Sequence, residues 1–590
     1  MQKRWILRES PNPEIVKKLC SEINVSTPIA AILSQRKIND FDTAKAFFRP
    51  SLNDLHNPFL MKDMDEAIAR LNNAVKSGEK ILIYGDYDVD GTCSVALLYT
   101  FLKGFYQHID FYVPDRYSEG YGISEKGIEF AAKEGFSLIV ALDCGIRAID
   151  QIALANSFGI DVVVCDHHNP AERIPAAKAI LNPKQKDCDY PYKELTGCAI
   201  GFKLVQAYAE KYHIDQKQVF SLLDFAAVSI ACDIVPITGE NRILAKYGLK
   251  LLNTQPRAGF KALKDVASLP ESMNVTNLVF GIGPRINAAG RIKHAKQAVE
   301  LLITKEEERA IKIAKEVQIN NDTRKTYDEQ ITLEALSMIE EKNLKEWHST
   351  VLFKQDWHKG VIGIVASRCI EKYYRPTIII TESNGKATGS ARSVKGFDIH
   401  EAITACAEHL EQFGGHKYAA GLTLAINQVP LFAEKFEEIV KSNIPADLLI
   451  PKIEIDACIE LSQITWKFFN VIEQMAPFGP ENRRPVFMAK VICKKDRMRI
   501  LKEKHLKMSV SQIGIDFSID AIAFNFSDIS QKIQHDVPFY LCFTIEKNEF
   551  RGKTTLQLMI KDIKTELDKE EAHLLQNRNS FLFSEEKDAE

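Results

Sequence analysis

Paired cysteines are missing from this chain of 590 residues, which holds twelve cysteines but no C-x-x-C motif. Several of them, including Cys144, Cys165 and Cys232, stand within apolar runs, where cysteine commonly acts as a small buried hydrophobic residue. The pattern argues against a disulfide framework and favours a reducing compartment. We therefore expect a cytoplasmic protein.

Long apolar runs and a strong net charge are missing as well. No stretch approaches the roughly 20 apolar residues of a membrane-spanning helix. Residues 1–9 lack the apolar core of a signal peptide. We therefore expect no membrane partner. The net charge of -3 does not by itself indicate a polyanionic partner, although a sum over the whole chain conceals any local basic surface.

The length and composition predict a protein of several domains. Hydrophobic residues make up 45% of the chain, enough for several cores, and the length suggests roughly three to five domains. We interpret the successive patterns as a helical N-terminal segment (1–75), an α/β domain (76–294), a long connecting helix (295–345), a second α/β domain (346–450), a small β-barrel of oligonucleotide-binding type (451–565) and an acidic tail (566–590).

Residues 76 to about 180 alternate apolar strands with helical patterns, which predicts βαβ units and a mostly parallel sheet. Helices are expected at Ser124–Glu134 and Ala148–Phe158. The expected strands are Lys80–Asp86, Ile109–Val113, Ser137–Asp143, Asp161–Asp166 and Ala179–Asn182. The runs L-I-V-A-L-D and D-V-V-V-C-D are apolar up to their last residue, as in strands that are covered on both faces.

Acidic and histidine side chains follow three of these strands. They are Asp86, Asp88 and Asp90 of D-Y-D-V-D-G, Asp143 of D-C-G, and Asp166, His167 and His168 of D-H-H. Parallel strands bring such residues to one edge of the sheet, where open α/β folds bind ligands. A single acid there often caps a helix or lies in a solvated loop. Their recurrence on successive strands favours a site for a hard divalent metal ion.

A further acid, Asp233, is the only charged residue of the helical run F-A-A-V-S-I-A-C-D-I-V-P at residues 225–236. An acid in such a place either caps a neighbouring helix or reaches the metal site. With the other acids in view, we favour the metal site.

The second half of the chain offers three patterns. Residues 295–343 are strongly charged and contain neither proline nor glycine, which predicts a long solvated helix between two globular parts. Small residues gather in G-S-A-R-S and G-G-H-K-Y-A-A-G, which are typical of tight turns or of an anion-binding backbone nest. The stretch from Arg483 to Lys507 holds ten Lys or Arg and two acids. Basic strands with nearby aromatic residues such as Phe487 suit a single-strand groove, although they also occur as charged edge strands.

The combination of D-x-D-G, D-C-G and D-H-H resembles the DHH phosphoesterase superfamily. Further motifs, in order and spacing over about residues 40–565, resemble the RecJ family of single-strand-specific DNA exonucleases. They are F-F-R-P-S-L (47–52), Y-G-D-Y-D-V-D-G (84–91), G-I-G-P-R-I-N-A-A-G-R (281–291), G-S-A-R-S (389–393), G-G-H-K-Y-A-A-G (414–421) and P-F-G-P-E-N-R-R-P-V-F (477–487).

This resemblance implies a metal centre and a phosphate site. The metal ligands that it implies are Asp88, Asp90, Asp143, His167 and Asp233, with Asp143 as a candidate bridge between two Mn²⁺ or Mg²⁺ ions. His168 either ligates a metal or positions the scissile phosphate. Many members of the superfamily have a histidine where this chain has Tyr84, so Asp86 or a water is expected to fill that place. The phosphate-binding residues that we expect are Arg116, Arg285, Arg291, Ser390, Arg392 and His416.

We therefore expect a metal-dependent 5′→3′ exonuclease on single-stranded DNA, acting as a monomer in recombination and repair alongside a single-strand-binding protein and a helicase. One alternative is a phosphodiesterase of the same superfamily for nanoRNA or cyclic dinucleotides, and the basic barrel argues against it. A second is a non-catalytic single-strand-binding protein, and the complete set of acids argues against that.

Overall fold

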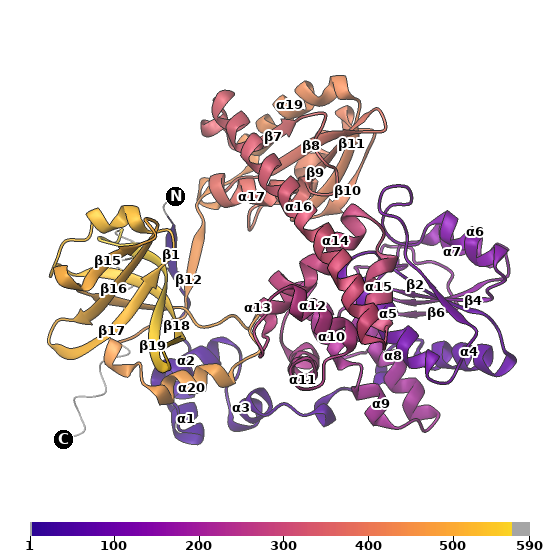
Figure 1. The fold of residues 1–590 in the computed structure, drawn as a ribbon, viewed down its shortest axis with the longest axis horizontal. Helices are drawn as coiled ribbons and strands as arrows, with labels where there is room; N and C mark the ends of the chain where they lie inside the picture. The colour runs from indigo at the N-terminus through magenta and orange to yellow at the C-terminus, as the bar shows by residue number, and fades with distance from the viewer. Residues whose placement is uncertain (1–2, 569–570, 572–590) are drawn as a thin grey trace. The chain divides into compact units, whose positions relative to one another are not determined.

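The structure is a computed structural model that describes residues 3–568 and 571. The chain forms two compact units (Figure 1). The central unit is Leu52–Leu449, and the terminal unit combines Met1–Ser51 with Ile450–Glu590. All twelve cysteines lie in the described part of the chain and all are free thiols. Within the described residues, no helix is long and apolar enough to cross a membrane.

The central unit contains a five-stranded sheet with the order β3-β2-β4-β5-β6, and all its strands are parallel. The strands are β2 (Ile81–Gly85), β3 (Ile109–Tyr112), β4 (Leu138–Leu142), β5 (Asp161–Cys165) and β6 (Ala179–Leu181). Each lies within one residue at either end of the strand expected from the sequence. The predicted parallel sheet is therefore confirmed.

Helices cover both faces of this sheet because every second strand residue points to the same face. Leu82 and Ile139 pack against α6 (Glu125–Lys133) and α7 (Ile149–Ser157). Ile83 and Val140 belong to the larger core on the opposite face. That core also takes in α4 (Met64–Ser77), α5 (Val89–Lys103), α8 (Gly197–Lys211) and α10 (Leu223–Cys232).

The remaining helices of this region lead to the second sheet. They are α9 (Gln216–Phe220), α11 (Gly239–Thr254), α12 (Ala258–Val266), α13 (Val275–Asn277), a π-helix (Leu278–Ile282), α14 (Gly283–Ile292), α15 (Lys296–Ile303) and α16 (Glu307–Glu341). The single helix expected at 295–345 is therefore two helices. The break lies at Thr304, which is extended and whose hydroxyl accepts a hydrogen bond from the Glu306 amide at 3.3 Å. Such a side-chain bond competes with helix formation.

A second five-stranded sheet has the order β10-β11-β9-β8-β7, in which only β7 and β8 run parallel. Its elements are β7 (Thr350–Phe353), α17 (Ile362–Tyr373), β8 (Thr377–Ser383), β9 (Lys386–Arg392), α18 (Ile399–Thr404), β10 (Gln412–His416), β11 (Ala419–Leu424) and α19 (Val429–Asn443). G-S-A-R-S lies almost wholly in β9, and its interpretation as a tight turn or a backbone nest is wrong, since β9 pairs along its length with both β8 and β11. G-G-H-K-Y-A-A-G forms the end of β10, a tight turn at residues 417–418 and the start of β11, so the interpretation as a tight turn holds for that segment.

The terminal unit is built around a barrel-like sheet with the order β13-β14-β18-β19-β17-β16-β15. Its strands are β13 (Ala457–Cys458), β14 (Phe487–Val491), β15 (Met498–Leu501), β16 (His505–Gln512), β17 (Ile515–Ala523), β18 (Phe539–Phe550) and β19 (Lys553–Lys564). A bridge between Ile492 and Ser511 brings the region after β14 against β16, so the sheet curls toward closure. Phe487 is fully buried in this barrel, so the expectation that it faces a single strand is wrong.

The N-terminal residues belong to the terminal unit. The strand β1 (Arg4–Leu7) pairs with β12 (Lys452–Ile455), and α1 (Pro13–Ile23), α2 (Thr27–Gln35), α3 (Phe41–Phe48) and α20 (Trp466–Gln474) share a core with the barrel. The chain therefore passes from one unit to the other near residue 51, and the expected boundary at residue 75 is too late. Most of the expected acidic tail, including Phe581, Leu582 and Phe583, lies outside the described residues.

Candidate metal centre and phosphate pocket

The carboxyl ends of β2, β4 and β5 lie side by side, because these three strands are neighbours in the sheet. Asp86 and Asp88 follow β2, Asp143 follows β4, and the D-H-H residues follow β5. Asp90 lies in the first turn of α5, and Asp233 is the residue that ends α10. The sheet edge thus gathers the acids that the sequence motifs pointed to.

His167 stands at the centre of this group. Its Nε2 lies 3.2 Å from Asp143 Oδ1, 3.6 Å from Asp233 Oδ2 and 3.7 Å from Asp90 Oδ2. Adjacent ligands of an octahedral ion at about 2.1 Å lie about 3 Å apart, so these separations are close to those of a shared cation. Two groups of possible ligands meet at His167, namely Asp90 with Asp233 and Asp143 with His168.

The unpaired oxygens at this edge also fit a cation. Both carboxylate oxygens of Asp143 are buried and have no hydrogen-bond partner among the described residues. Burial, followed by the charges of Asp90 and Asp88, raises the pKa of Asp143 and of Asp233 well above the ordinary value. Burial and Asp90 also raise the pKa of Asp88. Carboxylate and imidazole donors without thiolates suit Mn²⁺ or Mg²⁺, so the residues present fit the implied metals.

Asp90 is held in place by the beginning of α8. Its carboxylate accepts hydrogen bonds from the amides of Gly197, at 2.7 Å, and Cys198, at 2.9 Å. The Ser229 hydroxyl of α10 donates to the same carboxylate at 2.7 Å. Helix N-termini stabilise negative charge in this way. The approach of α8 requires a glycine, since a Cβ on Gly197 would stand 2.6 Å from the Asp143 Cβ.

Asp166 orients His168. Its carboxylate lies 2.7 Å from His168 Nδ1 and accepts hydrogen bonds from the amides of Ile146 and His168. Burial alone would raise the pKa of Asp166. The hydrogen bonds and the charge of His168 outweigh burial and lower this pKa to about 2. Asp166 is therefore ionised and fixes the imidazole, leaving Nε2 toward the site and 3.3 Å from the Tyr121 hydroxyl.

Asp86 and Tyr84 lie at the margin of the site. The Tyr84 hydroxyl accepts from the Ser124 amide and donates to the Gly122 carbonyl, and its ring is part of the core under α6. Asp86 is fully buried, accepts a long bond of 3.4 Å from Gly122, and has one oxygen without a partner. It belongs to neither group of possible ligands around His167. Its role as a ligand stays a prediction.

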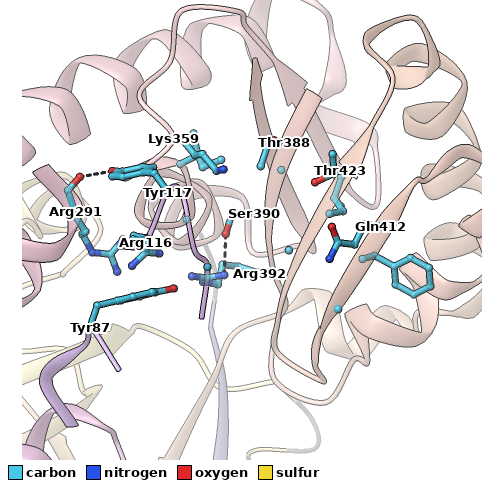
Figure 2. Close-up of a pocket in the computed structure, with 18 residues that line it drawn as sticks. Tyr87, Arg116, Tyr117, Arg291, Lys359, Thr388, Ser390, Arg392, Gln412 and Thr423 are labelled. Atoms are coloured by element: carbon cyan, nitrogen blue, oxygen red, sulfur yellow. Dashed lines mark hydrogen bonds between the residues drawn. The ribbon is translucent and has the colours of Figure 1, made fainter. Parts of the chain in front are cut away.

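A cationic pocket of 450 Å³ lies in the same unit (Figure 2). Arg116, Arg291 and Arg392 line it, and Figure 2 shows their guanidinium groups on the side away from Gln412 and Thr423. Burial and neighbouring arginines lower the pKa of Arg291 to about 9. Burial and Arg116 likewise lower the pKa of Arg392. Cations crowded in this manner favour an anion, and the fork of arginine suits a phosphate.

The pocket also uses β9 and the start of α17. Ser390 and Arg392 point to one face of β9, and the Arg392 guanidinium donates to Ser390 Oγ at 3.1 Å. Gly363, in the first turn of α17, leaves the room they occupy, because a Cβ there would stand 2.8 Å from both side chains. The N-terminus of α17 thus adds its positive end to the pocket.

Two of the expected phosphate-binding residues lie elsewhere. Arg285 is buried in α14, where it donates hydrogen bonds to the Gly281 carbonyl and to the Gln318 side chain. Its guanidinium group is therefore engaged in contacts within the protein. His416 lines a different cavity, with Tyr121, Arg147 and His168. Sequence reasoning missed Tyr87 and Lys359, which line the cationic pocket. The only signal for Lys359 was its place before glycine in W-H-K-G, ahead of a helix.

Comparisons with known proteins agree with this architecture. Family models match residues 80–230 (DHH family, N-terminal domain), residues 347–442 (DHHA1 domain) and residues 455–562 (RecJ OB domain). The single-stranded-DNA-specific exonuclease RecJ of Bacillus subtilis is 34% identical over 95% of this chain and 70% of its own length. The chain belongs to the RecJ family.

RecJ of Escherichia coli is 32% identical over 85% of this chain and 90% of its own length. The crystal structure of RecJ in complex with Mn²⁺ from Thermus thermophilus has the same fold. It has a TM-score of 0.83 and 24% identity, covering 96% of this chain and 80% of that one. The RecJ family thus accounts for both α/β parts of the central unit and for the barrel.

Proposed function

We propose that this chain is a metal-dependent exonuclease that removes nucleotides from single-stranded DNA in the 5′→3′ direction. Membership of the RecJ family supports the enzyme class, since the relatives are named single-stranded-DNA-specific exonucleases. The observation that carries the proposal is the presence, within one unit, of a crowded carboxylate–histidine cluster and a pocket lined by three arginines. The first fits divalent cations and the second fits a phosphate.

In this proposal Asp88, Asp90, Asp143, His167 and Asp233 hold two ions of Mn²⁺ or Mg²⁺, with Asp86 as a further candidate ligand. Bound there, the ions supply electrostatic stabilisation of the attacking and leaving oxygens of an in-line displacement. His168, oriented by Asp166, either completes the ligand set or donates from Nε2 to the scissile phosphate. The amides at the start of α8 keep Asp90 in place while the substrate binds.

The arginine pocket gives the reaction its direction. Arg116, Arg291, Arg392 and Ser390 bind the phosphate of the 5′-terminal nucleotide, and Lys359 adds a further positive charge. With the terminal phosphate held, the next phosphodiester along the strand is the one presented to the carboxylates. Each cleavage then releases one nucleotide from the 5′ end.

The barrel binds the rest of the single-stranded DNA. The basic stretch 483–507 runs through β14 and β15, and the loops beside them, to the start of β16. Phe524 is half exposed beside His505, with their rings 5.0 Å apart. Basic strands with exposed rings bind single strands through phosphate contacts and stacking. We propose that Phe524, and not Phe487, is the aromatic residue on which a base of the single strand stacks.

By resemblance to the family, we propose that the chain acts as a monomer in recombination and repair, alongside a single-strand-binding protein and a helicase.

The experiment compares wild type with Asp143→Asn on a single-stranded oligonucleotide and on the blunt duplex of the same sequence. Wild type should degrade the single strand with Mn²⁺ and not with EDTA, and should leave the duplex intact. Asp143→Asn should lower the cleavage rate by roughly 100-fold or more. Residues that only hydrogen-bond to metal ligands already contribute up to about 100-fold to activity, and Asp143 is proposed to be a ligand itself. Equal degradation of single strand and duplex, or activity in EDTA, would refute the proposal.

A further inference from the structure

The arginine pocket is larger than one phosphate group requires. Its volume is 450 Å³. A phosphate is the size of a few water molecules, each of which takes up about 30 Å³ in the liquid, and pockets of about 300 Å³ or more hold ligands of drug size. Figure 2 shows the three arginines beside Tyr87 at one end, and Gln412 and Thr423 at the other. The pocket therefore has room for a further group beyond the phosphate.

The sheet of β9, β11 and β10 forms the wall at the end away from the arginines. Side chains at every second strand position share a face. Ser390 is paired with Gly421, and Gly421 with Gly414, so these three residues form one row across the sheet. The next row on the same face consists of Thr388, Thr423 and Gln412. All six residues line the pocket, and we call the two glycines with this polar row the glycine trough.

The helix α17 covers one half of this sheet face and leaves the trough open. Apolar residues of α17 share a core with Leu352 of β7 and Ile379 of β8. The opposite face of β9 and β11 is buried under α18 and α19. Helices pack on sheets through apolar side chains, whereas the trough presents glycine, hydroxyl and amide groups. It therefore suits a small polar ligand better than a partner helix.

Neither the backbone nor the packing of the protein requires the two glycines of the trough. Both have ordinary strand backbones and not the left-handed conformation that favours glycine. A Cβ added to Gly414 would meet no heavy atom of the described residues within 4 Å, apart from its chain neighbours. A Cβ added to Gly421 would meet the Gly389 carbonyl oxygen at 3.9 Å. The protein would accept larger side chains here, so the space that the glycines leave is available to a ligand.

The trough lies beyond the terminal phosphate and away from the metal centre. Tyr87 stands between Asp86 and Asp88 in the sequence and lines the arginine end, where the Arg116 guanidinium lies 4.8 Å from its ring centre. The terminal nucleoside joins the terminal phosphate to the scissile bond, so it runs from the arginine end toward the carboxylates. A group that reaches the trough must therefore be attached to the other side of the terminal phosphate (Figure 2).

We propose that the glycine trough binds a nucleoside joined to the 5′ phosphate through a phosphoanhydride, so that the enzyme removes the first nucleotide together with this cap. This inference rests on the proposed function. Charge favours such a cap over one more nucleotide of an ordinary strand. A pyrophosphate bridge carries about two negative charges, as a terminal phosphate does at neutral pH, whereas an internal phosphodiester carries one. The arginines thus meet the same charge with and without the cap.

The polar row of the trough fits an adenosine. The amide of Gln412 both donates and accepts, which is the pattern that pairs with the edge of adenine. The hydroxyls of Thr388 and Thr423 can bond to the ribose hydroxyls, since each is a donor and an acceptor. The flat base would lie over Gly414 and Gly421, where a side chain would otherwise stand.

The cleavage reaction is the same for a capped strand. Water adds to the phosphorus between the first and second nucleotides, and the bond from this phosphorus to O3′ of the first nucleotide breaks. One proton of the water passes to O3′, and the hydroxyl stays on phosphorus. The products are the adenylylated nucleotide, with its phosphoanhydride intact, and a shortened strand with a 5′ phosphate.

The test is release of the first nucleotide from a 20-mer that carries either a 5′ phosphate or a 5′-adenylyl group, by wild type and by Gly414→Val. The quantity compared is kcat/KM on the adenylylated strand divided by kcat/KM on the phosphorylated strand. Wild type should release the adenylylated nucleotide. Gly414→Val should lower the ratio by roughly 10- to 200-fold, as a misfit of a methyl group in a pocket does. Valine is favourable in strands, so the sheet is kept.

The matched control is Thr554→Val, which places a valine at an exposed position of β19 in the terminal unit. It should leave the ratio at the wild-type value. Three results would overturn the inference and leave the proposed function standing: cleavage of the phosphorylated strand alone, release of free AMP, or a ratio that Gly414→Val does not change. The last result is also expected if the terminal base of the phosphorylated strand occupied the trough, because both substrates would then be slowed. If wild type cleaves neither strand, the proposed function fails and the inference fails with it.

Discussion

Gly197 and Asp143 lie so close that a methyl group on the glycine would stand 2.6 Å from the Asp143 Cβ and 2.7 Å from its Cα. The same glycine donates its amide to Asp90. One residue without a side chain therefore sets the separation of two candidate metal ligands. Asp143 itself has a left-handed backbone with φ 59°, so little freedom is left to move it away.

The first prediction follows from that contact. Gly197→Ala should reduce metal-dependent cleavage by roughly 100-fold or more, as misplaced catalytic groups do, because α8 or Asp143 must shift. Gly201→Ala on the same helix is the matched control, since its Cβ would meet only a Leu142 methyl at 3.2 Å. Initial rates at saturating Mn²⁺ are the measurement. Equal rates for the two variants would contradict the account.

The second prediction concerns Asp166. Asp166→Asn should lower kcat by about 10- to 100-fold with little change in KM, because an amide cannot hold the His168 imidazole as the ionised carboxylate does. His168→Gln should lower the rate at least as much. The double variant should be no slower than His168→Gln alone. An additive loss in the double variant would show that Asp166 acts independently of His168.

The third prediction links metal, pH and stability. Because the folded-state pKa of Asp143 is raised, its contribution to stability is present at low pH and is lost as pH rises from about 4. Removing its charge should therefore stabilise the metal-free protein at pH 7 by about 1.4 kcal/mol for each unit of raised pKa.

Thermal unfolding of wild type and Asp143→Asn, in EDTA and in Mn²⁺, measures this effect. In EDTA the variant should melt above wild type at pH 7, and the difference should narrow as the pH falls and close at about pH 4. Mn²⁺ should reverse the order, since metal binding to the folded state stabilises it. A wild type that is the more stable protein in EDTA at pH 7 would be the contradictory result.

The fourth prediction concerns a buried ion pair away from the site. Lys203 Nζ lies 2.6 Å from Glu240 Oε1 with both side chains buried, and it donates to the His56 carbonyl. Lys203→Met should cost about 3–5 kcal/mol of unfolding free energy, because Glu240 is left as an unpaired buried charge. Lys203→Met with Glu240→Leu should recover part of the loss. Denaturant unfolding measures the unfolding free energy of the single and the double variant. A Lys203→Met variant as stable as wild type would contradict a buried ion pair between Lys203 and Glu240.

The sequence predicted the parallel sheet well because β2, β4 and β5 are buried on both faces and each is followed by an acid. It could not separate the three acids of D-Y-D-V-D-G. After Gly85 the chain turns, so Asp86 enters the core beside Gly122, Asp88 caps α5 and Asp90 lies inside its first turn. Residues at every second position share a face only while the strand continues, so their spacing does not separate the roles of these acids.

Other features depend on tertiary contacts that no local pattern reveals. Arg285 stands in a glycine-rich motif, yet its hydrogen bond to Gly281, one turn earlier, directs it into the helix. Phe487 lies next to basic residues, and its strand alternates so that the ring is inside and Lys490 is outside. The pairing of β1 with β12 joins residues that are more than 400 positions apart.

The central claim is cleavage from the 5′ end by a metal-dependent site. The most direct measurement uses one single-stranded oligonucleotide, labelled at the 5′ end in one sample and at the 3′ end in another, with Mn²⁺ and with EDTA. The account predicts immediate release of the 5′ label as a mononucleotide and gradual shortening of the 3′-labelled strand, both only with Mn²⁺. Release of the 3′ label first, or cleavage that persists in EDTA, would contradict it.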